Sequence, residues 1–137
     1  MSRAEEIKAI IARLYAARRS GDLDSILRFF DENATFAMSG SKQASAAAME
    51  AKGVDQIRAA LTNLLDAYDM HEQTILSFLV DDEKAAVHHR SKMTFKPTGE
   101  AFDTEMLDLW KLKGDKIISV IEFVDTALAQ HHLLQVK

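Results

Sequence analysis

The sequence predicts an α+β domain in which helices pack on one face of a strongly curved, antiparallel sheet. As far as residue 68, apolar residues recur at steps of three and four, which is typical of amphipathic helices. After residue 70 the apolar residues alternate or cluster in four runs separated by short turn sequences, which is typical of strands joined by hairpins. Helices followed by antiparallel strands indicate an α+β fold.

The first helix is expected over residues 3–19, where the apolar side chains form a stripe along one side. Gly21 follows two arginines and is expected to end this helix. Asp22 or Asp24 is suited to cap a short second helix that runs to Phe30.

Residues 34–38 are predicted to form a brief strand. Residues 39–52 are rich in Ser, Ala and Lys and predict a surface loop or a short mobile helix, which could act as a lid. Residues 54–68 return to helical spacing after Gly53.

The remaining chain is predicted to be mostly strand. Asp125 and Thr126 are expected to open a short terminal helix that ends near Leu134, with Asp125 as its cap. The expected strands cover residues 70–80, 84–95, 102–112 and 116–124.

Composition limits the class of protein. The chain has 137 residues, enough for one domain over residues 1–137, and we find no internal repeat or linker. It has no cysteine, which excludes disulfides and thiolate chemistry. Its net charge of -4 is the wrong sign for binding nucleic acid. We find neither a signal peptide nor a membrane span, so we expect a cytoplasmic protein that does not bind membranes.

Several chemistries are excluded by spacing. The five glycines form no phosphate loop, dinucleotide fingerprint or nucleophile elbow. His88 and His89 are adjacent on a strand and point to opposite faces, so they cannot hold one metal. His131 and His132 lie ~100° apart on a helix and are interpreted as cations near its end. We therefore expect no metal and no cofactor.

Two carboxyl groups lie in apolar rows of the expected strands. Asp108 shares a face with Met106 and Trp110, and Glu122 shares one with Val120 and Val124. Burial disfavours a charged carboxylate and leaves a neutral acid able to donate a proton. If both rows line one hollow, two acids face it.

The structural alternative stays open for each acid. Asp108 or Glu122 could pair with Arg90 or Lys92, or its row could face a dimer partner instead of a cavity. By the same alternation, His89 points inward. Tyr15 and Phe36 are interpreted as core residues, because helical and strand spacing already explains them.

Six stretches of the chain form a recognisable series, namely residues 13–24, 33–36, 53–58, 98–102, 114–118 and 122–126. Taken in order, they resemble the nuclear transport factor 2-like (NTF2-like) superfamily, which includes steroid delta-isomerases and SnoaL-like polyketide cyclases. The resemblance covers almost the whole chain, and its motifs specify the fold better than the reaction.

The resemblance implies a cone: a bent, mixed sheet wraps the N-terminal helices and leaves an apolar pocket, and many members form homodimers through the outer sheet face. Of the steroid isomerase residues, the oxyanion-binding tyrosine falls at Leu14 and the proton-shuttling aspartate at Met38, so both are lost. The second oxyanion donor falls at Asp108 and is kept.

These expectations suggest a cofactor-independent isomerase or cyclase that performs acid–base chemistry on a small apolar carbonyl compound. Asp108 would be the neutral acid, and Glu122 or His89 the base. The alternative is a non-catalytic ligand-binding or dimerisation module of the same fold. The expected ligand-binding residues are Leu14, Phe36, Met38, Met106, Trp110, Val120 and Val124.

Overall fold

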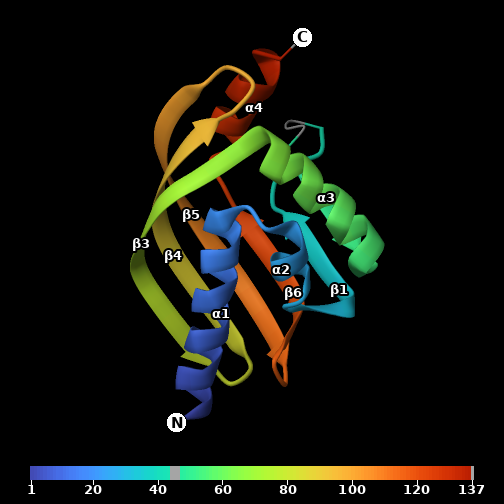
Figure 1. The fold of residues 1–137 in the computed structure, drawn as a ribbon, viewed down its shortest axis with the longest axis vertical. Coiled ribbons are helices and arrows are strands. Elements are labelled where there is room, and N and C mark those ends of the chain that lie inside the picture. Colours follow the sequence, from blue (N-terminus) through green and yellow to red (C-terminus); the bar gives the residue numbers. More distant parts are fainter. Residues whose placement is uncertain (44–46, 137) are drawn as a thin grey trace.

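A six-stranded mixed sheet wraps around the N-terminal helix in the computed structural model, which describes residues 1–43 and 47–136. Three helices lie over one face of the sheet, and the fourth sits at the end of the molecule opposite the N-terminus (Figure 1). The elements in chain order are α1 (Arg3–Ser20), α2 (Leu23–Leu27), β1 (Phe30–Met38), β2 (Met49–Lys52), α3 (Gly53–Ala67), β3 (Tyr68–Asp81), β4 (Lys84–Phe95), β5 (Glu100–Lys113), β6 (Lys116–Phe123) and α4 (Thr126–Leu134).

The predicted α+β class is confirmed, and the sheet is mixed. Its strand order is β2-β1-β6-β5-β4-β3, in which β1 and β6 run parallel and every other neighbouring pair is antiparallel. Register shifts interrupt β3 at two points and β5 near Lys111. An extra residue on one strand bends it and increases its twist, so these shifts help the sheet to curl around α1.

The first helix has the boundaries that its sequence predicts. The Ser2 hydroxyl accepts a hydrogen bond from the Glu5 backbone N–H at its start, and Gly21 ends it in the left-handed conformation with φ 74°. Its apolar stripe is buried against the sheet, and Ile7 and Ile11 are fully enclosed. Burial of this stripe fixes which side chains of α1 face the interior.

Replacing Gly21 tests this helix end. A non-glycine residue is strained at φ 74°, although nothing lies within 4 Å of a Cβ placed there. We therefore expect Gly21→Ala to lower the free energy of unfolding by about 1 kcal/mol and Gly21→Asn to lower it less. Urea denaturation of the two variants beside the wild type measures both changes, and an unchanged midpoint in Gly21→Ala would contradict the assignment.

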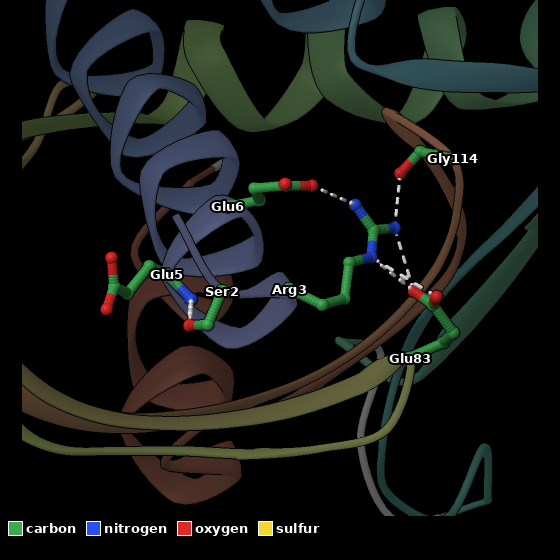
Figure 2. Close-up of polar contacts among 6 residues, drawn as sticks. All are labelled: Ser2, Arg3, Glu5, Glu6, Glu83 and Gly114. Atoms are coloured by element: carbon green, nitrogen blue, oxygen red, sulfur yellow. Dashed lines mark hydrogen bonds and ion pairs between the residues drawn. The ribbon is translucent and has the colours of Figure 1, made fainter.

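Salt bridges and hydrogen bonds fix the start of α1 to two hairpin turns (Figure 2). The Arg3 guanidinium forms an ion pair with Glu83, at 2.7 Å from Nη2 to Oε2, and donates a hydrogen bond to the carbonyl of Gly114. Glu83 lies in the turn between β3 and β4, and Gly114 lies in the turn between β5 and β6. Arg3 thus connects the helix to both hairpins and fixes its position across the sheet.

Two expectations in the first half of the chain were wrong in extent. The second helix ends at Leu27, and Phe30 instead begins β1, because the chain there pairs with β6 at Ile117. The stretch 39–52 is not wholly loop or helix, since Met49–Lys52 forms β2 and pairs with the end of β1. Residues 44–46 of the expected lid lie outside the described residues.

Most of the interior is one apolar core between α1, α2, α3 and the concave face of the sheet. Met70, Met93 and Met106 form a smaller buried cluster, and the partly buried side chains of Tyr68, Phe102 and Val124 pack against it. In the part of the chain that the structure describes, no helix is both long and apolar enough to cross a membrane.

Candidate functional site

Two adjoining cavities open between the sheet and the helices. The larger has a volume of about 420 Å³ and reaches from Phe36 to α4, and the smaller has a volume of about 60 Å³ and lies beside α1. A volume of several hundred Å³ is typical of pockets that bind small molecules. Both cavities are lined by Phe36, Leu64, Met93, Met106 and Glu122.

Asp108 lies at the wall of the smaller cavity and is the centre of a buried hydrogen-bond network. It is only 3% exposed. The Tyr15 hydroxyl donates to its Oδ2 atom at 2.6 Å, and His89 Nε2 lies 3.0 Å from the same oxygen. Trp110 Nε1 donates in turn to the Tyr15 hydroxyl at 3.2 Å. The network therefore holds one carboxylate oxygen from two directions.

His89 is oriented from both sides of its ring. It is 1% exposed, and its Nδ1 atom lies 3.1 Å from the Ser91 hydroxyl. Both ring nitrogens therefore have an oxygen within hydrogen-bonding distance, which fixes the orientation of the ring. The predicted directions of the two adjacent histidines are confirmed, since His88 is partly exposed and contacts Glu105.

The other oxygen of Asp108 has no partner among the described residues. The Oδ1 atom is buried and makes no hydrogen bond there. Leaving such an oxygen unpaired costs free energy, and unpaired buried polar atoms of this kind are rare in folded proteins. Because Asp108 lines the smaller cavity, a ligand in that cavity could supply the missing donor.

Glu122 pairs with Asp108 across neighbouring strands β5 and β6 and lines both cavities. Burial, followed by the negative charge of Asp108, raises the pKa of Glu122 from its ordinary value to about 8, and the Arg18 guanidinium acts against this rise. Glu122 is therefore mostly protonated at neutral pH. The two acids that the sequence placed in apolar rows do face adjoining cavities.

The structure also brings in two side chains of α1 that the sequence analysis did not assign to the site. Tyr15 is in the core, as expected, yet its hydroxyl contacts Asp108. Burial, and then the charge of Asp108, raises the pKa of Tyr15, so the hydroxyl remains protonated. Arg18 is buried and lines the smaller cavity. The sequence does contain a sign that Arg18 faces the interior, because this residue lies seven positions after Ile11 and so falls on the apolar stripe of α1.

The expected ligand-binding residues lie at the cavities with one exception. Val120 was predicted to line the pocket and does not, because it packs deep in the core, opposite Phe36 and Trp110 of the neighbouring strands. The remaining residues are divided between the two cavities. Leu14 and Trp110 line the smaller cavity, Met38 and Val124 line the larger one, and Phe36 and Met106 line both.

The terminal helix α4 closes one side of the larger cavity. Asp125 accepts a hydrogen bond from the Leu128 backbone N–H, so its predicted capping role is confirmed. His132 was interpreted as a helix-end cation but is 1% exposed. Its Nε2 atom lies 2.6 Å from Glu100, and its Nδ1 atom lies 3.0 Å from the Tyr68 hydroxyl. These two contacts of the buried His132 ring hold α4 over the cavity.

The alternative partners considered for the two acids are engaged elsewhere or point away. Arg90 forms an ion pair with Glu105 on the outer face, and Lys92 lies on the same face of β4 as Arg90. In the described part of the chain, no group of three or more His, Asp or Glu side chains is placed to hold a metal ion.

Comparison with solved structures places this arrangement among known folds. A Bacillus subtilis protein provisionally named an isomerase superposes with a TM-score of 0.85 at 13% identity, over 97% of this chain and 96% of that one. Bal32a, from a soil-derived mobile gene cassette, gives 0.77 at 23% identity, over 96% and 98%. A Xanthomonas campestris protein provisionally named a polyketide cyclase gives 0.77 at 12% identity, over 96% and 99%. No curated protein matches the sequence.

A curved sheet wrapped around a helix, with cavities on its concave side, is the NTF2-like fold. Within that class, the SnoaL-like domain model matches residues 11–120, and the chain belongs to the SnoaL-like domain family. The fold is shared by proteins with different activities, so the reaction must be argued from the side chains at the cavities.

Proposed function

We propose that this protein is a cofactor-independent acid–base enzyme that moves a proton on a small, mostly apolar carbonyl compound. The observation that carries the proposal is the pair of Asp108 and Glu122 at adjoining cavities, with opposite hydrogen-bonding needs. One carboxylate has a buried oxygen without a partner, and the other acid keeps its proton at neutral pH. Two acids set apart in this way are suited to act as base and acid.

Asp108 is assigned as the base. Its Oδ2 atom is occupied by Tyr15 and His89, so Oδ1 is the oxygen that remains able to take a proton. The proton comes from the carbon next to the substrate carbonyl, and the electron pair of that C–H bond moves toward the carbonyl oxygen. Tyr15 and His89 position Asp108 and do not themselves need to touch the substrate.

Glu122 is assigned as the acid. Its protonated carboxyl group donates to the carbonyl oxygen as negative charge develops there, and yields an enol when the proton is transferred. To complete the reaction, the enol takes a proton on carbon from the Asp108 carboxyl group and returns its O–H proton to the Glu122 carboxylate, which restores both side chains. This assignment reverses the roles that the sequence suggested, because the raised pKa of about 8 belongs to Glu122 and the hydrogen-bond donors surround Asp108.

Exchange of carbon-bound hydrogen tests the proposed proton transfer directly. A small apolar ketone such as 2-tetralone is incubated with the protein in deuterated water, and loss of its hydrogens next to the carbonyl is followed by proton NMR. We expect exchange above the buffer rate. Ligand binding reported by the single Trp110 without any acceleration across a panel of ketones would indicate a binding protein instead.

We also propose that the chain forms a homodimer through the outer face of the sheet. Apolar side chains cross that face in register, from Leu79 through Ala86 and Leu109 to Ile121. Leu79 is 68% exposed and Leu109 is 39% exposed. Exposed apolar rows of this kind are typical of surfaces that bind another protein surface.

A charge placed in this row tests the dimer. We expect sedimentation equilibrium to give twice the chain mass for the wild type and the mass of one chain for Leu109→Arg, because association would bury the new charge without a partner. Lys113→Arg, on a strand end of the same sheet, is the control and is expected to remain a dimer. A monomeric wild type would refute the proposed homodimer.

A further inference from the structure

Arg18 is a buried cation at the smaller cavity that the proposed proton transfer does not use. It comes from the inward face of α1, is 8% exposed and lines the cavity together with Asp108 and Glu122. Its Nη2 atom donates one hydrogen bond to the carbonyl of Tyr68 at 3.1 Å. A guanidinium group carries several further N–H donors in a fixed planar fork.

The charge of Arg18 has no close counterion. Among the described residues, no carboxylate oxygen lies within the 4.0 Å of an ion pair with this guanidinium. Glu122 on β6 and Asp69 on β3 act on it only over a longer distance, and burial lowers its pKa. Burying an unpaired charge is costly, so buried arginines are normally paired with an anion.

The acidic groups that face this cavity have other contacts or carry a proton, and neither forms an ion pair with Arg18. Asp108 on β5 receives Tyr15 from α1 and His89 from β4. Glu122 is mostly protonated at neutral pH, since its pKa is raised to about 8. Within the described part of the chain, the positive charge of Arg18 therefore has no ion-pair partner at this end of the site.

The shape of the cavities suits a ligand with one small anionic group. A volume of about 60 Å³ accommodates a few water-sized groups, which is enough for a carboxylate. The larger cavity, of about 420 Å³, adjoins it through shared side chains that include Phe36 and Met106. An apolar body could thus occupy the larger cavity while a carboxylate reaches Arg18.

We propose that Arg18 binds a carboxylate group of the ligand, so that the substrate is a small, mostly apolar carbonyl compound that also carries a carboxylate. The statement about the substrate rests on the proposed function, whereas the binding of a carboxylate does not. Arginine is well suited to this task, because its planar fork matches both oxygens of a carboxylate.

Binding of a matched pair of probes tests the inference. 2-Naphthoate and 2-naphthamide have the same apolar body and nearly the same shape, and only the former is an anion. By isothermal titration calorimetry at about pH 6.5, where Glu122 is protonated, we expect the wild type to bind 2-naphthoate about tenfold or more tightly than the amide.

Two arginine variants test whether the preference for 2-naphthoate depends on Arg18. Arg18→Met keeps most of the side-chain volume, and we expect it to bind the two probes equally. Arg19→Met removes the next positive charge along the chain, which is exposed and contacts Gln73, and we expect it to keep the wild-type preference. Thermal unfolding of both variants establishes that they are folded. Equal binding of the probes by the wild type, or an unchanged preference in Arg18→Met, would overturn the inference.

A second measurement needs no variant of Arg18. A bound carboxylate disfavours the ionised form of Glu122. Binding of 2-naphthoate near pH 8 should therefore be accompanied by uptake of protons at Glu122. Titrations in buffers of different ionisation enthalpy measure this uptake, and we expect none for the amide. Absence of uptake with 2-naphthoate would count against binding beside Glu122. Preference for the carboxylate without hydrogen exchange in any ketone would instead leave the inference standing and refute the proposed function.

Discussion

Replacing Asp108 by asparagine is expected to reduce hydrogen exchange of a ketone substrate by about 10²-fold to 10⁴-fold, with KM changed only a few-fold. An amide cannot take the proton from carbon, and removal of a positioned acid or base usually costs this much in rate. The substitution keeps the shape of the side chain, so the apolar walls that bind the ligand stay in place. Exchange followed by NMR in deuterated water gives kcat and KM separately.

Asp103→Asn is the matched control for this prediction. Asp103 lies on the same strand, five residues earlier, and its exposed side chain is on the outer face of the sheet. We expect this variant to exchange hydrogen at the wild-type rate. Equal activity in Asp108→Asn and Asp103→Asn would show that Asp108 is not the base.

The free energy of unfolding of the wild type is expected to fall as the pH rises from about 5 to 8, and Glu122→Gln is expected to lack this fall. Between the ordinary pKa of a glutamate and the raised value of about 8, the folded state holds a proton that the unfolded state has released. The unfolded state therefore binds fewer protons, and stability falls with increasing pH by at most about 1.4 kcal/mol per unit. Glutamine has no proton to lose, so its profile lacks this fall.

Urea denaturation at several pH values measures the difference between the two proteins. We expect the free energy of unfolding of Glu122→Gln, relative to the wild type, to increase by roughly 2–4 kcal/mol from about pH 5 to 8. Glu32→Gln, an exposed residue on β1, serves as the control and should follow the wild type. A constant difference between Glu122→Gln and the wild type across this range would mean that the carboxyl group is not held protonated in the fold.

The same coupling links the two acids. The negative charge of Asp108 is one of the causes that raise the pKa of Glu122, so its loss in Asp108→Asn should lower that pKa. The fall in stability with pH should then end at a lower pH in Asp108→Asn than in the wild type. This shift is expected if the charge of Asp108 acts on Glu122. It is not expected if the two acids titrate independently of each other.

The local pattern was informative wherever one face of an element is buried. The apolar stripe and Gly21 predicted α1 to within one residue of its end, and β4 has the residue range that its alternation predicts. The boundaries of β1 and β2 did not follow from local pattern. They depend on pairing between segments far apart in the chain, such as Phe30 with Ile117, which local propensity does not contain.

Some residues of the candidate site could be predicted from local pattern, and others could not. Alternation along β4, β5 and β6 placed His89, Asp108 and Glu122 on the inward face, because successive side chains of a strand point to opposite faces. It could not show that Tyr15 and Arg18 reach the same place from α1, nor that Val120 packs too deeply to meet a ligand. Those positions depend on how the helix crosses the sheet.

The sequence by itself therefore determined the class of fold, the inward direction of the two acids and the capping roles of Gly21 and Asp125. Only the tertiary structure decided which acid keeps its proton and which oxygen lacks a partner. Burial and charge act through space, and the groups that set them for Asp108 and Glu122 come from separate elements.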